Sequence, residues 1–498
     1  MTVRGSHLQP MRRIRRVHFV GIGGSGMSGI AEVLVNQGFD VSGSDLAASR
    51  ATRRLAGMGA TIFRGHDASQ VEYADVLVVS SAVSEENPEV MAARERRIPV
   101  VPRAEMLAEL MRFRRGIAVA GTHGKTTTTS LTASLLAEAG MDPTFVIGGL
   151  VNSFGSHARL GKGEYLVAEA DESDGSFLLV QPVVALITNI DKDHLSAYDN
   201  SFENLKKAFR EFLHHLPFYG AAVLCLDDEH IVEMIPSVTR AVVTYGLHED
   251  ADIRAENLRQ SGRMMHFDVF LPNQAESMPV SLNLPGEHNV ANALGSIAIA
   301  WELGLDLNEI VGSLASFEGI GRRFAEVGQF DLPNGGVTVI EDYGHHPSEL
   351  DATITAAREG WPDSRVVAVF QPHRYTRTRA LLQEFTRSFN NSDVLVVLPI
   401  YAASEAPIAG VSGQALGECI RAHGHRNVIC LNSLTECVDH LEKTLASGDL
   451  LLTLGAGDVY RVGEMVLERM SADGGRRTEV GGRRSEDRSQ KSGVRSQE

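Results

Sequence analysis

A lysine and a threonine directly follow a glycine turn in the stretch GTHGKTTTT. The apolar residues 117–120 precede Gly121 and predict a short buried strand, and an apolar-periodic helix is expected after the turn. Such a turn points backbone N–H groups at an anion, and the helix N-terminus favours negative charge. Lys125 would reach the β- and γ-phosphates of a nucleotide, and the Thr126 hydroxyl would hold Mg²⁺. The turn is a shortened P-loop, because Val119 stands where the complete motif has its first glycine; the alternative is an ordinary helix start with a solvated lysine.

Carboxylates follow two further predicted strands. The strand at 165–168 runs into EADESD, which begins at Glu169, and the strand at 183–188 runs into NIDKDH, which ends at His194. Magnesium takes one or two carboxylates together with phosphate oxygens. The carboxyl ends of parallel strands meet at one edge of a sheet, so these side chains are expected near the phosphate turn. A solvated acidic loop and a structural histidine are the alternatives.

A second glycine turn lies near the N-terminus, between a predicted strand at 17–21 and a predicted helix. Gly21, Gly23 and Gly26 satisfy G-x-G-x-x-G, and Asp45 ends the next strand 19 residues further on. The pattern indicates a diphosphate at a helix N-terminus and a carboxylate near a ribose or base. A UDP group meets these demands as well as NAD does, and a turn used only for tight packing is the alternative.

Arginines follow a predicted strand at 366–370 in the stretch QPHRYTRTR. The chain carries a net charge of −16, so positive charge for an anionic ligand has to be concentrated locally. The guanidinium groups of Arg374, Arg377 and Arg379 suit a carboxylate or a phosphate, because the planar fork binds either one bidentately. A solvated basic helix start is the alternative.

Two asparagines and a histidine stand at the start of an alanine-rich predicted helix that ends near Leu303. Asparagine at a helix start is often a plain cap. The amides of Asn289 and Asn292 also suit the donor and acceptor edge of adenine. The pattern alone does not decide between these roles.

Strands and helices alternate along the chain, which predicts an α/β fold. A length of 498 residues suggests three domains of about 150 residues each. Residues near Gly319 to Phe324 resemble a hinge, and the last segment is composed almost entirely of Gly, Arg, Ser, Glu, Asp and Gln. The predicted division is a Rossmann-like domain at 1–115, a central P-loop ATPase α/β domain at 116–322, a C-terminal Rossmann-like α/β domain at 323–470 and a disordered tail at 471–498.

Composition excludes several classes of protein. The negative net charge disfavours a nucleic-acid-binding surface. No apolar run approaches the ~20 residues of a membrane span. The four cysteines show no CxxC spacing, which favours free thiols over disulfides or zinc, and we expect a cytoplasmic protein.

Eight motifs occur in order and together resemble the Mur ligases of bacterial cell-wall synthesis: GIGGSGMSG, GTHGKTTT, EADESD, TNIDKDH, LPGEHNVANA, GRRF, DYGHHP and QPHRYTR. The resemblance covers about residues 15–470 and is closest to the branch that adds L-alanine. It implies ATP-dependent ligation of L-alanine to the carboxylate of UDP-N-acetylmuramate through an acyl phosphate, in peptidoglycan precursor synthesis. The chemistry is consistent, because a carboxylate is a poor acyl donor until one oxygen becomes a phosphate leaving group.

The resemblance also assigns roles to single residues. Catalytic roles fall to Lys125, His194, His345, Arg374 and Arg377. The ATP site comprises Gly121, Thr122, His123, Gly124, Lys125, Thr126, Thr127, His288, Asn289, Asn292, Arg323 and Asp342, the last two meeting ATP only on domain closure. The UDP-sugar site comprises Gly23, Gly24, Ser25, Gly26, Met27, Asp45, His66 and Ser81. Two Mg²⁺ ions are expected, the first on Thr126 and Glu169 and the second on His194.

Three other functions compete with this interpretation. A recycling ligase that joins murein tripeptide to UDP-N-acetylmuramate shares the phosphate and UDP motifs. An NAD-dependent oxidoreductase would explain only the N-terminal motif, and a nucleotide-binding regulator would need no turnover. The resemblance implies UDP-N-acetylmuramate and L-alanine as partners and no carbamylated lysine of the kind that related ligases carry. We expect a monomer or weak dimer.

Overall fold

The computed structural model describes residues 11, 13–80 and 82–472. Ser81 and residues 473–498 of the predicted tail lie outside this described part of the chain. The described residues form two compact units. The first extends to Phe324 and includes Ala352–Pro362, and the second comprises Ala325–Asp351 and the chain from Asp363 onward.

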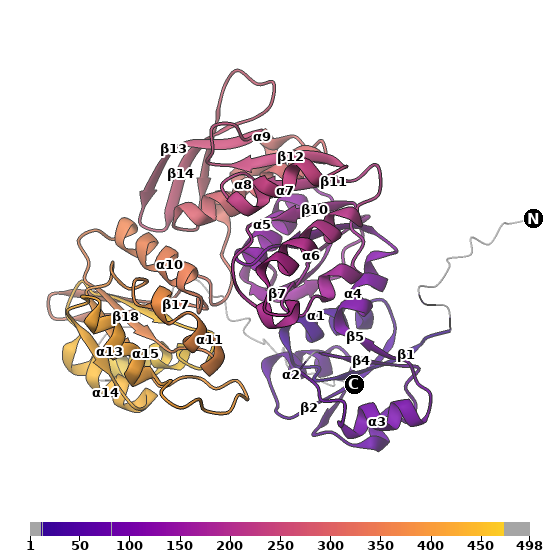
Figure 1. The fold of residues 1–498 in the computed structure, drawn as a ribbon, viewed down its shortest axis with the longest axis horizontal. Coiled ribbons are helices and arrows are strands. Elements are labelled where there is room, and N and C mark those ends of the chain that lie inside the picture. The colour runs from indigo at the N-terminus through magenta and orange to yellow at the C-terminus, as the bar shows by residue number, and fades with distance from the viewer. Residues whose placement is uncertain (1–10, 12, 81, 473–498) are drawn as a thin grey trace, which may run out of the picture. The chain divides into compact units, whose positions relative to one another are not determined.

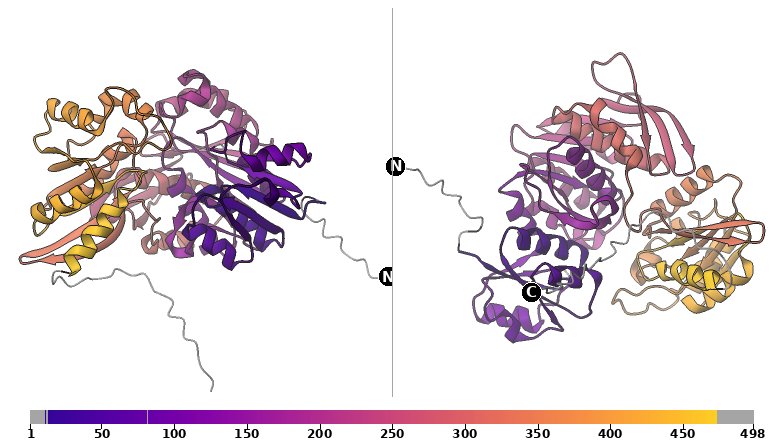
Figure 2. Two further views of the ribbon diagram at one scale, coloured as in Figure 1. Left: turned by 90° about the horizontal axis from the view of Figure 1, so that it is seen from below. Right: turned by 180° about the vertical axis from the view of Figure 1, so that it is seen from behind.

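The N-terminal sheet has five parallel strands in the order β3-β2-β1-β4-β5 (Figure 1). β1 lies at the centre, and the direction of winding reverses there, which places the glycine turn after β1 at the switch point of the sheet. This arrangement confirms the predicted Rossmann-like fold; the indigo arrows in the left view of Figure 2 belong to this sheet. The strands are β1 (Arg16–Val20), β2 (Asp40–Asp45), β3 (Thr61–Arg64), β4 (Val76–Val79) and β5 (Val100–Pro102), and the helices are α1 (Ser25–Asn36), α2 (Arg50–Gly57), α3 (Pro88–Glu95) and α4 (Arg103–Met111).

The central sheet has ten strands in the order β15-β14-β13-β12-β11-β10-β6-β9-β7-β8. Its middle strands are parallel, and β6 lies between β10 and β9. The turn after β6 therefore lies beside the ends of the two strands that carry the predicted carboxylates and histidine. The strands around this point are β6 (Arg115–Ala120), β7 (Thr144–Val151), β8 (Ser156–Arg159), β9 (Tyr165–Glu169), β10 (Val184–Ile187), β11 (Ala221–Cys225) and β12 (Ala241–Gly246).

Three antiparallel strands extend this sheet at one edge. They are β13 (Ile253–Ser261), β14 (Met264–Phe270) and β15 (Met278–Leu282). The helices of the central part include α5 (Lys125–Glu138), α6 (Phe202–His214), α7 (Glu229–Met234), α8 (Glu287–Glu302) and α9 (Leu307–Ile310). Strands such as β10 are buried along their whole length, because a parallel sheet is covered on both faces.

The second unit contains a six-stranded sheet in the order β16-β17-β21-β18-β19-β20, in which β16 is the antiparallel strand. All three sheets thus agree with the predicted α/β class, although β6 begins one residue before the predicted boundary at 116. The strands are β16 (Ala325–Leu332), β17 (Gly335–Asp342), β18 (Val366–Phe370), β19 (Val394–Val397), β20 (Val428–Cys430) and β21 (Leu450–Leu454), and the helices are α10 (Pro347–Gly360), α11 (Tyr375–Ala380), α12 (Leu382–Phe385), α13 (Gly413–Ala422), α14 (Leu434–Thr444) and α15 (Tyr460–Ala472). The exact domain boundaries stay predictions.

The helices in the described part of the chain all lack the combination of length and apolar character that a membrane-crossing helix needs.

Candidate functional site

The turn between β6 and α5 requires both of its glycines. Gly121 has φ +129° and Gly124 has φ +79°, backbone conformations that L side chains rarely adopt. A Cβ at Gly121 would lie 2.0 Å from Thr188 Oγ1, and a Cβ at Gly124 would lie 2.4 Å from Asn292 Oδ1. The tight turn places Lys125 and Thr126 in the first turn of α5, where the orphan N–H groups of a helix bind anions.

Residues that follow β10 brace this turn from the side. Thr188 Oγ1 donates to the His123 carbonyl at 2.6 Å, and Asn189 Oδ1 accepts from the His123 N–H at 2.8 Å. Thr122 Oγ1 accepts from the Asp191 N–H at 2.9 Å, and His123 Nε2 lies 3.0 Å from Asp191 Oδ2. The motif TNIDKDH therefore shapes the phosphate turn, a role that sequence analysis did not give it.

The Lys125 ammonium is held inward by three acceptors. Its Nζ donates to the Gly121 carbonyl at 2.6 Å, to the Thr122 carbonyl at 3.1 Å and to Glu172 Oε2 at 2.7 Å. Burial opposes its charge, but the carboxylates of Glu172 and Asp171 outweigh burial and raise the pKa of Lys125. Lys125 is thus a charged group poised in the turn, and it must exchange at least one acceptor to contact a phosphate.

Glu172 was part of the predicted carboxylate cluster but was not assigned a role. Its side chain is 1% exposed, and its Oε1 is a buried oxygen without a hydrogen-bond partner among the residues that the structure describes. Burial raises the pKa of this carboxyl to about 7, although Lys125 pulls it down. The Tyr198 hydroxyl donates to the Glu172 backbone carbonyl at 2.5 Å, which fixes the loop. The buried partner of the P-loop lysine is therefore Glu172.

The raised pKa predicts a pH-dependent contribution to stability. The pKa of the Glu172 carboxyl is 4.5 in the unfolded chain and about 7 in the folded protein. The protonated carboxyl therefore contributes its full stabilisation below pH 4.5, and this stabilisation is lost as the pH rises through about 7. Glu172→Gln cannot titrate. We therefore compare the unfolding free energies of the wild type and Glu172→Gln. The value for the wild type minus the value for the variant should fall between pH 4.5 and about 7, by at most about 1.4 kcal/mol per pH unit. Urea unfolding of both proteins at several pH values tests this, and a pH-independent difference would contradict it.

The proposed first metal site pairs a hydroxyl with a carboxylate. Glu169 ends β9, its Oε1 accepts from the Gly148 N–H at 2.6 Å, and burial raises its pKa despite hydrogen bonds from Gly148 and Thr126. Thr126 follows Lys125 in the first turn of α5. One hydroxyl and one carboxylate beside a phosphate turn are a donor set that fits Mg²⁺, which fills its other positions with water and phosphate oxygens.

His194 lies beyond the end of β10, next to Asp193. Its φ is 54°, in the left-handed region, and its Nε2 lies 3.3 Å from Asp193 Oδ2. A non-glycine residue in this region is uncommon and is often found at functional sites. The backbone conformation is compatible with the predicted metal role, which stays a prediction.

The asparagines of α8 are buried and are joined to α5. Asn292 Oδ1 accepts from Thr128 Oγ1 at 3.1 Å, and Asn292 Nδ2 donates to Asn289 Oδ1 at 3.2 Å. Asn289 Nδ2 donates to the Pro285 carbonyl at 2.7 Å. These contacts brace the phosphate helix and give the pair a structural role, whereas its role at the adenine stays a prediction. His288 is exposed at the start of α8, Thr127 is buried in α5, and Arg323 lies in the predicted hinge.

The N-terminal glycine turn is held by β2. Asp45 Oδ2 accepts from the Gly23 N–H at 2.9 Å, and the Ser44 carbonyl accepts from the N–H groups of Gly21 and Ile22 at 2.9 and 3.0 Å. The Asp45 carboxylate therefore fixes the turn as well as lying at the predicted ligand edge. Gly24 caps α1, Ser25 and Gly26 lie in its first turn, and Met27 is buried.

Arg103 joins this turn to the central sheet. A Cβ at Gly26 would lie 2.7 Å from Arg103 Nη1, and Arg103 Nη2 lies 3.1 Å from Asp171 Oδ2. Asp171 immediately precedes Glu172, the partner of Lys125. This role of Arg103 was not predicted, because nothing in the sequence distinguishes a lone arginine of this kind from a solvated one.

The second unit gathers imidazole and guanidinium groups at the carboxyl ends of β17, β18 and β19. The rings of His345 and His373 lie 5.7 Å apart, and the ring of His373 stacks on Tyr401 at 5.5 Å. Arg377 Nη1 lies 3.3 Å from His373 Nδ1. Burial lowers the pKa of His345 to about 3, with Glu349 opposing the shift. His345 and Arg377 thus both lie beside His373, and their catalytic roles stay predictions. His373 and Tyr401 were not predicted.

Two further predicted residues anchor this edge. Asp342 ends β17, is buried and accepts from the Gly344 N–H at 2.7 Å through Oδ1. Arg374 precedes α11 with φ 71° and ψ 139°, a sparsely populated conformation for a residue with a side chain. Its N–H donates to the Tyr401 carbonyl at 2.9 Å. The strained backbone therefore stands at a predicted catalytic position.

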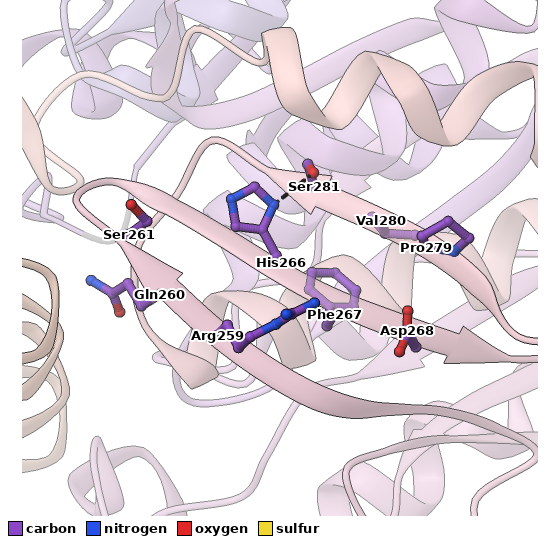
Figure 3. A pocket seen from close by; sticks show the side chains of 9 residues that line it. All are labelled: Arg259, Gln260, Ser261, His266, Phe267, Asp268, Pro279, Val280 and Ser281. Carbon is purple, nitrogen blue, oxygen red and sulfur yellow. Dashed lines mark hydrogen bonds between the residues drawn. The ribbon is translucent and has the colours of Figure 1, made fainter.

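A pocket of about 520 Å³ lies on the antiparallel strands β13, β14 and β15 (Figure 3). His266 Nδ1 and Ser281 Oγ are 2.8 Å apart there, and Arg259 and Asp268 also line it. The residues predicted for the UDP-sugar, ATP and metal sites do not line this pocket. It therefore contributes nothing to the candidate site described above.

Family models match nearly the whole chain. A model described as Mur ligase family, catalytic domain, matches residues 16–115, the Mur ligase middle domain matches residues 119–300, and a model described as Mur ligase, glutamate ligase domain, matches residues 322–457. These three segments correspond closely to the three sheets.

Individual proteins are also similar to this chain. A UDP-N-acetylmuramate–L-alanine ligase from Methylococcus capsulatus is 55% identical over 463 residues, which are 93% of this chain and 98% of the relative. The crystal structure of the UDP-N-acetylmuramate-alanine ligase MurC from Thermotoga maritima matches with a TM-score of 0.79 at 29% identity, covering 92% of this chain and 99% of that one. A murein peptide ligase from Psychrobacter arcticus matches with a TM-score of 0.69 at 24% identity, covering 91% and 98%, which is a likeness of fold.

Proposed function

Because the chain belongs to the Mur ligase family, we propose that it joins L-alanine to the carboxylate of UDP-N-acetylmuramate and converts ATP to ADP and phosphate. The observation that carries this proposal is the 55% identity to an L-alanine ligase over almost the full length of both chains. The reaction belongs to peptidoglycan precursor synthesis. ATP and nucleotide sugars are cytoplasmic metabolites, so the proposal places the enzyme in that compartment.

The reaction proceeds in two steps. A carboxylate oxygen of UDP-N-acetylmuramate attacks the γ-phosphorus of ATP, the new O–P bond forms, and the bond to ADP breaks. The amine of L-alanine then attacks the carbonyl carbon of the acyl phosphate. The tetrahedral intermediate expels phosphate, the nitrogen loses a proton, and the amide remains.

The central residues supply charge and position for the first step. Lys125 releases Glu172 and donates to the transferring phosphoryl group, while the turn and the N-terminus of α5 hold the other phosphate oxygens. Thr126 and Glu169 would hold one Mg²⁺ and His194 a second. When bound, these ions neutralise phosphate charge and so favour attack by a carboxylate.

The C-terminal residues supply the second step. Arg374 and Arg377 bind the carboxylate of L-alanine, since a guanidinium fork matches a carboxylate. His345 is held neutral by burial, so its ring can accept a hydrogen bond from the attacking amine. Asp342 and Arg323 contact ATP in this proposal.

Substrate-dependent ADP release tests the proposed function. ADP should form from Mg-ATP only when UDP-N-acetylmuramate and L-alanine are both present. The matched control replaces L-alanine with free murein tripeptide. Release with the tripeptide and not with L-alanine would assign the recycling ligation instead, and release that needs neither acceptor would remove the ligase assignment.

A further inference from the structure

A buried carboxylate in the N-terminal domain has no role in the reaction described so far. Glu89 lies in the first turn of α3 and is fully buried, with a relative exposure of 0%. Two imidazoles and one hydroxyl converge on it. His18 Nε2 lies 2.7 Å from Oε2, Ser44 Oγ donates to Oε2 at 2.9 Å, and His66 Nδ1 lies 2.7 Å from Oε1. A carboxylate without solvent persists in a protein when donors satisfy it in this way.

The network determines which nitrogen of His66 carries the proton. An ionised carboxylate accepts hydrogen bonds and donates none. The Ser44 hydroxyl lies 3.0 Å from His66 Nδ1 and donates its hydrogen to Glu89, so it can only accept from His66. Both neighbours of His66 Nδ1 are therefore acceptors, and this nitrogen must be the donor. Nε2 is therefore the nitrogen left for a ligand, and it is an acceptor when the ring is neutral.

His18 is the second imidazole that contacts Glu89. It is fully buried in β1, and its Nδ1 lies 2.8 Å from Ser42 Oγ, while its Nε2 contacts Glu89. Both of its nitrogens are thus used inside the fold. His66, with a side chain that is 19% exposed, is the one imidazole of the pair that reaches the surface.

The same residues connect His66 to the glycine turn. Ser44 contacts Glu89 and His66 through its hydroxyl, and its carbonyl accepts from the N–H groups of Gly21 and Ile22. His66 therefore lies at the carboxyl edge of the parallel sheet, beside the switch point where such sheets bind nucleotides.

We propose that Glu89 is a positioning residue for the nucleotide-sugar site, fixing the His66 ring with Nδ1–H inward so that Nε2 accepts a hydrogen bond from the bound uridine nucleotide. The partner is an O–H or N–H group of the ribose or uracil. This inference rests on the proposed function, because it assigns UDP-N-acetylmuramate to this edge. It adds Glu89 and His18 to the residues that determine affinity for that substrate.

Two substitutions of His66 separate the roles of its nitrogens. The amide nitrogen of asparagine occupies roughly the place of Nδ1, whereas the longer glutamine side chain can present its amide oxygen, an acceptor, near the place of Nε2. His66→Asn keeps the contact to Glu89 and loses the outward acceptor, so the Kd for UDP-N-acetylmuramate should rise about tenfold. His66→Gln retains reach toward the ligand and should bind more tightly than His66→Asn. Equal affinity of both variants and the wild type would overturn the proposal.

The direct test of positioning uses Glu89→Gln, with exposed Glu86→Gln as its matched control. Glu89→Gln should raise the Kd for UDP-N-acetylmuramate about tenfold and leave the KM values for ATP and L-alanine unchanged, whereas Glu86→Gln should change none of them. Nitrogen-15 NMR of the imidazoles in the free wild type, with His66→Asn for assignment, should show Nδ1 of His66 protonated.

The NMR measurement is made on the free wild-type protein. It therefore does not depend on whether a Glu89 variant folds, and it requires no substrate. A His66 ring protonated only at Nε2 would overturn the proposal, as would unchanged affinity in a folded Glu89→Gln protein. Failure of the proposed function looks different: the wild type would then release no ADP with UDP-N-acetylmuramate and L-alanine, while the imidazole signals would still report the ring orientation.

Discussion

Lys125→Ala is expected to reduce turnover about a thousandfold or more while the fold persists. The transferring phosphoryl group gathers negative charge in the transition state, and removal of a preorganised charge partner at such a group costs this much. Lys125 is the cation within the phosphate turn, held there by Gly121, Thr122 and Glu172. The measurement is kcat for ADP formation at saturating substrates, with exposed Lys207→Ala on α6 as the matched control.

The lysine variant also leaves a buried carboxylate without its cation. Removing one partner of a buried pair destabilises a protein by about 3–5 kcal/mol unless the other partner becomes neutral. The double variant Lys125→Ala with Glu172→Gln removes this complication, because no charge is left behind. It should be at least as stable as the single variant and equally inactive. Recovery of turnover in either protein would remove Lys125 from the reaction.

Substitution of Arg374 is expected to have the second large effect on activity. Alanine and glycine at this position should be equally harmful to activity but should differ in their effect on stability. The proposal has Arg374 bind the L-alanine carboxylate, so Arg374→Ala and Arg374→Gly should each lower kcat/KM for L-alanine about a hundredfold. The backbone at this position has φ 71°. Glycine adopts that conformation freely and alanine does not, so the glycine variant should be the more stable of the two by about 1 kcal/mol.

Comparing these two variants with each other controls for the lost side chain, because both lack it. The measurements are steady-state kinetics with varied L-alanine and urea unfolding of the two variants. Equal stability would show that the backbone at Arg374 carries no strain. Wild-type kinetics in both would remove Arg374 from the alanine site.

The elements that position the site were predictable because their signals are local. The strand before Gly121 is a continuous apolar run, and the strand that ends at Glu169 is similar. A buried parallel strand requires such a run. In the structure, β6 lies between β9 and β10, and this order brings Glu169 and the residues after β10 to the phosphate turn.

Short and polar elements were not predicted. α2 (Arg50–Gly57) reads RATRRLAG and buries only Thr52 and Leu55, so its apolar pattern is too sparse to indicate a helix. β3 (Thr61–Arg64) has four residues and no fully buried one. β15 and β8 are similarly brief. Their conformation is determined by tertiary pairing, which the local sequence does not carry.

The missed site residues share one property: their roles arise from contacts far apart in the sequence. Glu172 became the partner of Lys125 through a contact across 47 positions, and Glu89 meets His18 across 71. Arg103 reaches Asp171 across 68 positions. Single carboxylates and arginines are usually solvated, so a pattern of residue types could not have separated these from the others.

The most direct test of the account follows the carboxylate oxygen. The protein is given Mg-ATP, L-alanine and UDP-N-acetylmuramate with oxygen-18 in its carboxylate, and the products are analysed by mass spectrometry. The account predicts an L-alanyl product with one amide bond more than the substrate, and one labelled oxygen in each inorganic phosphate released. Phosphate without label, or a product formed only when murein tripeptide replaces L-alanine, would contradict it.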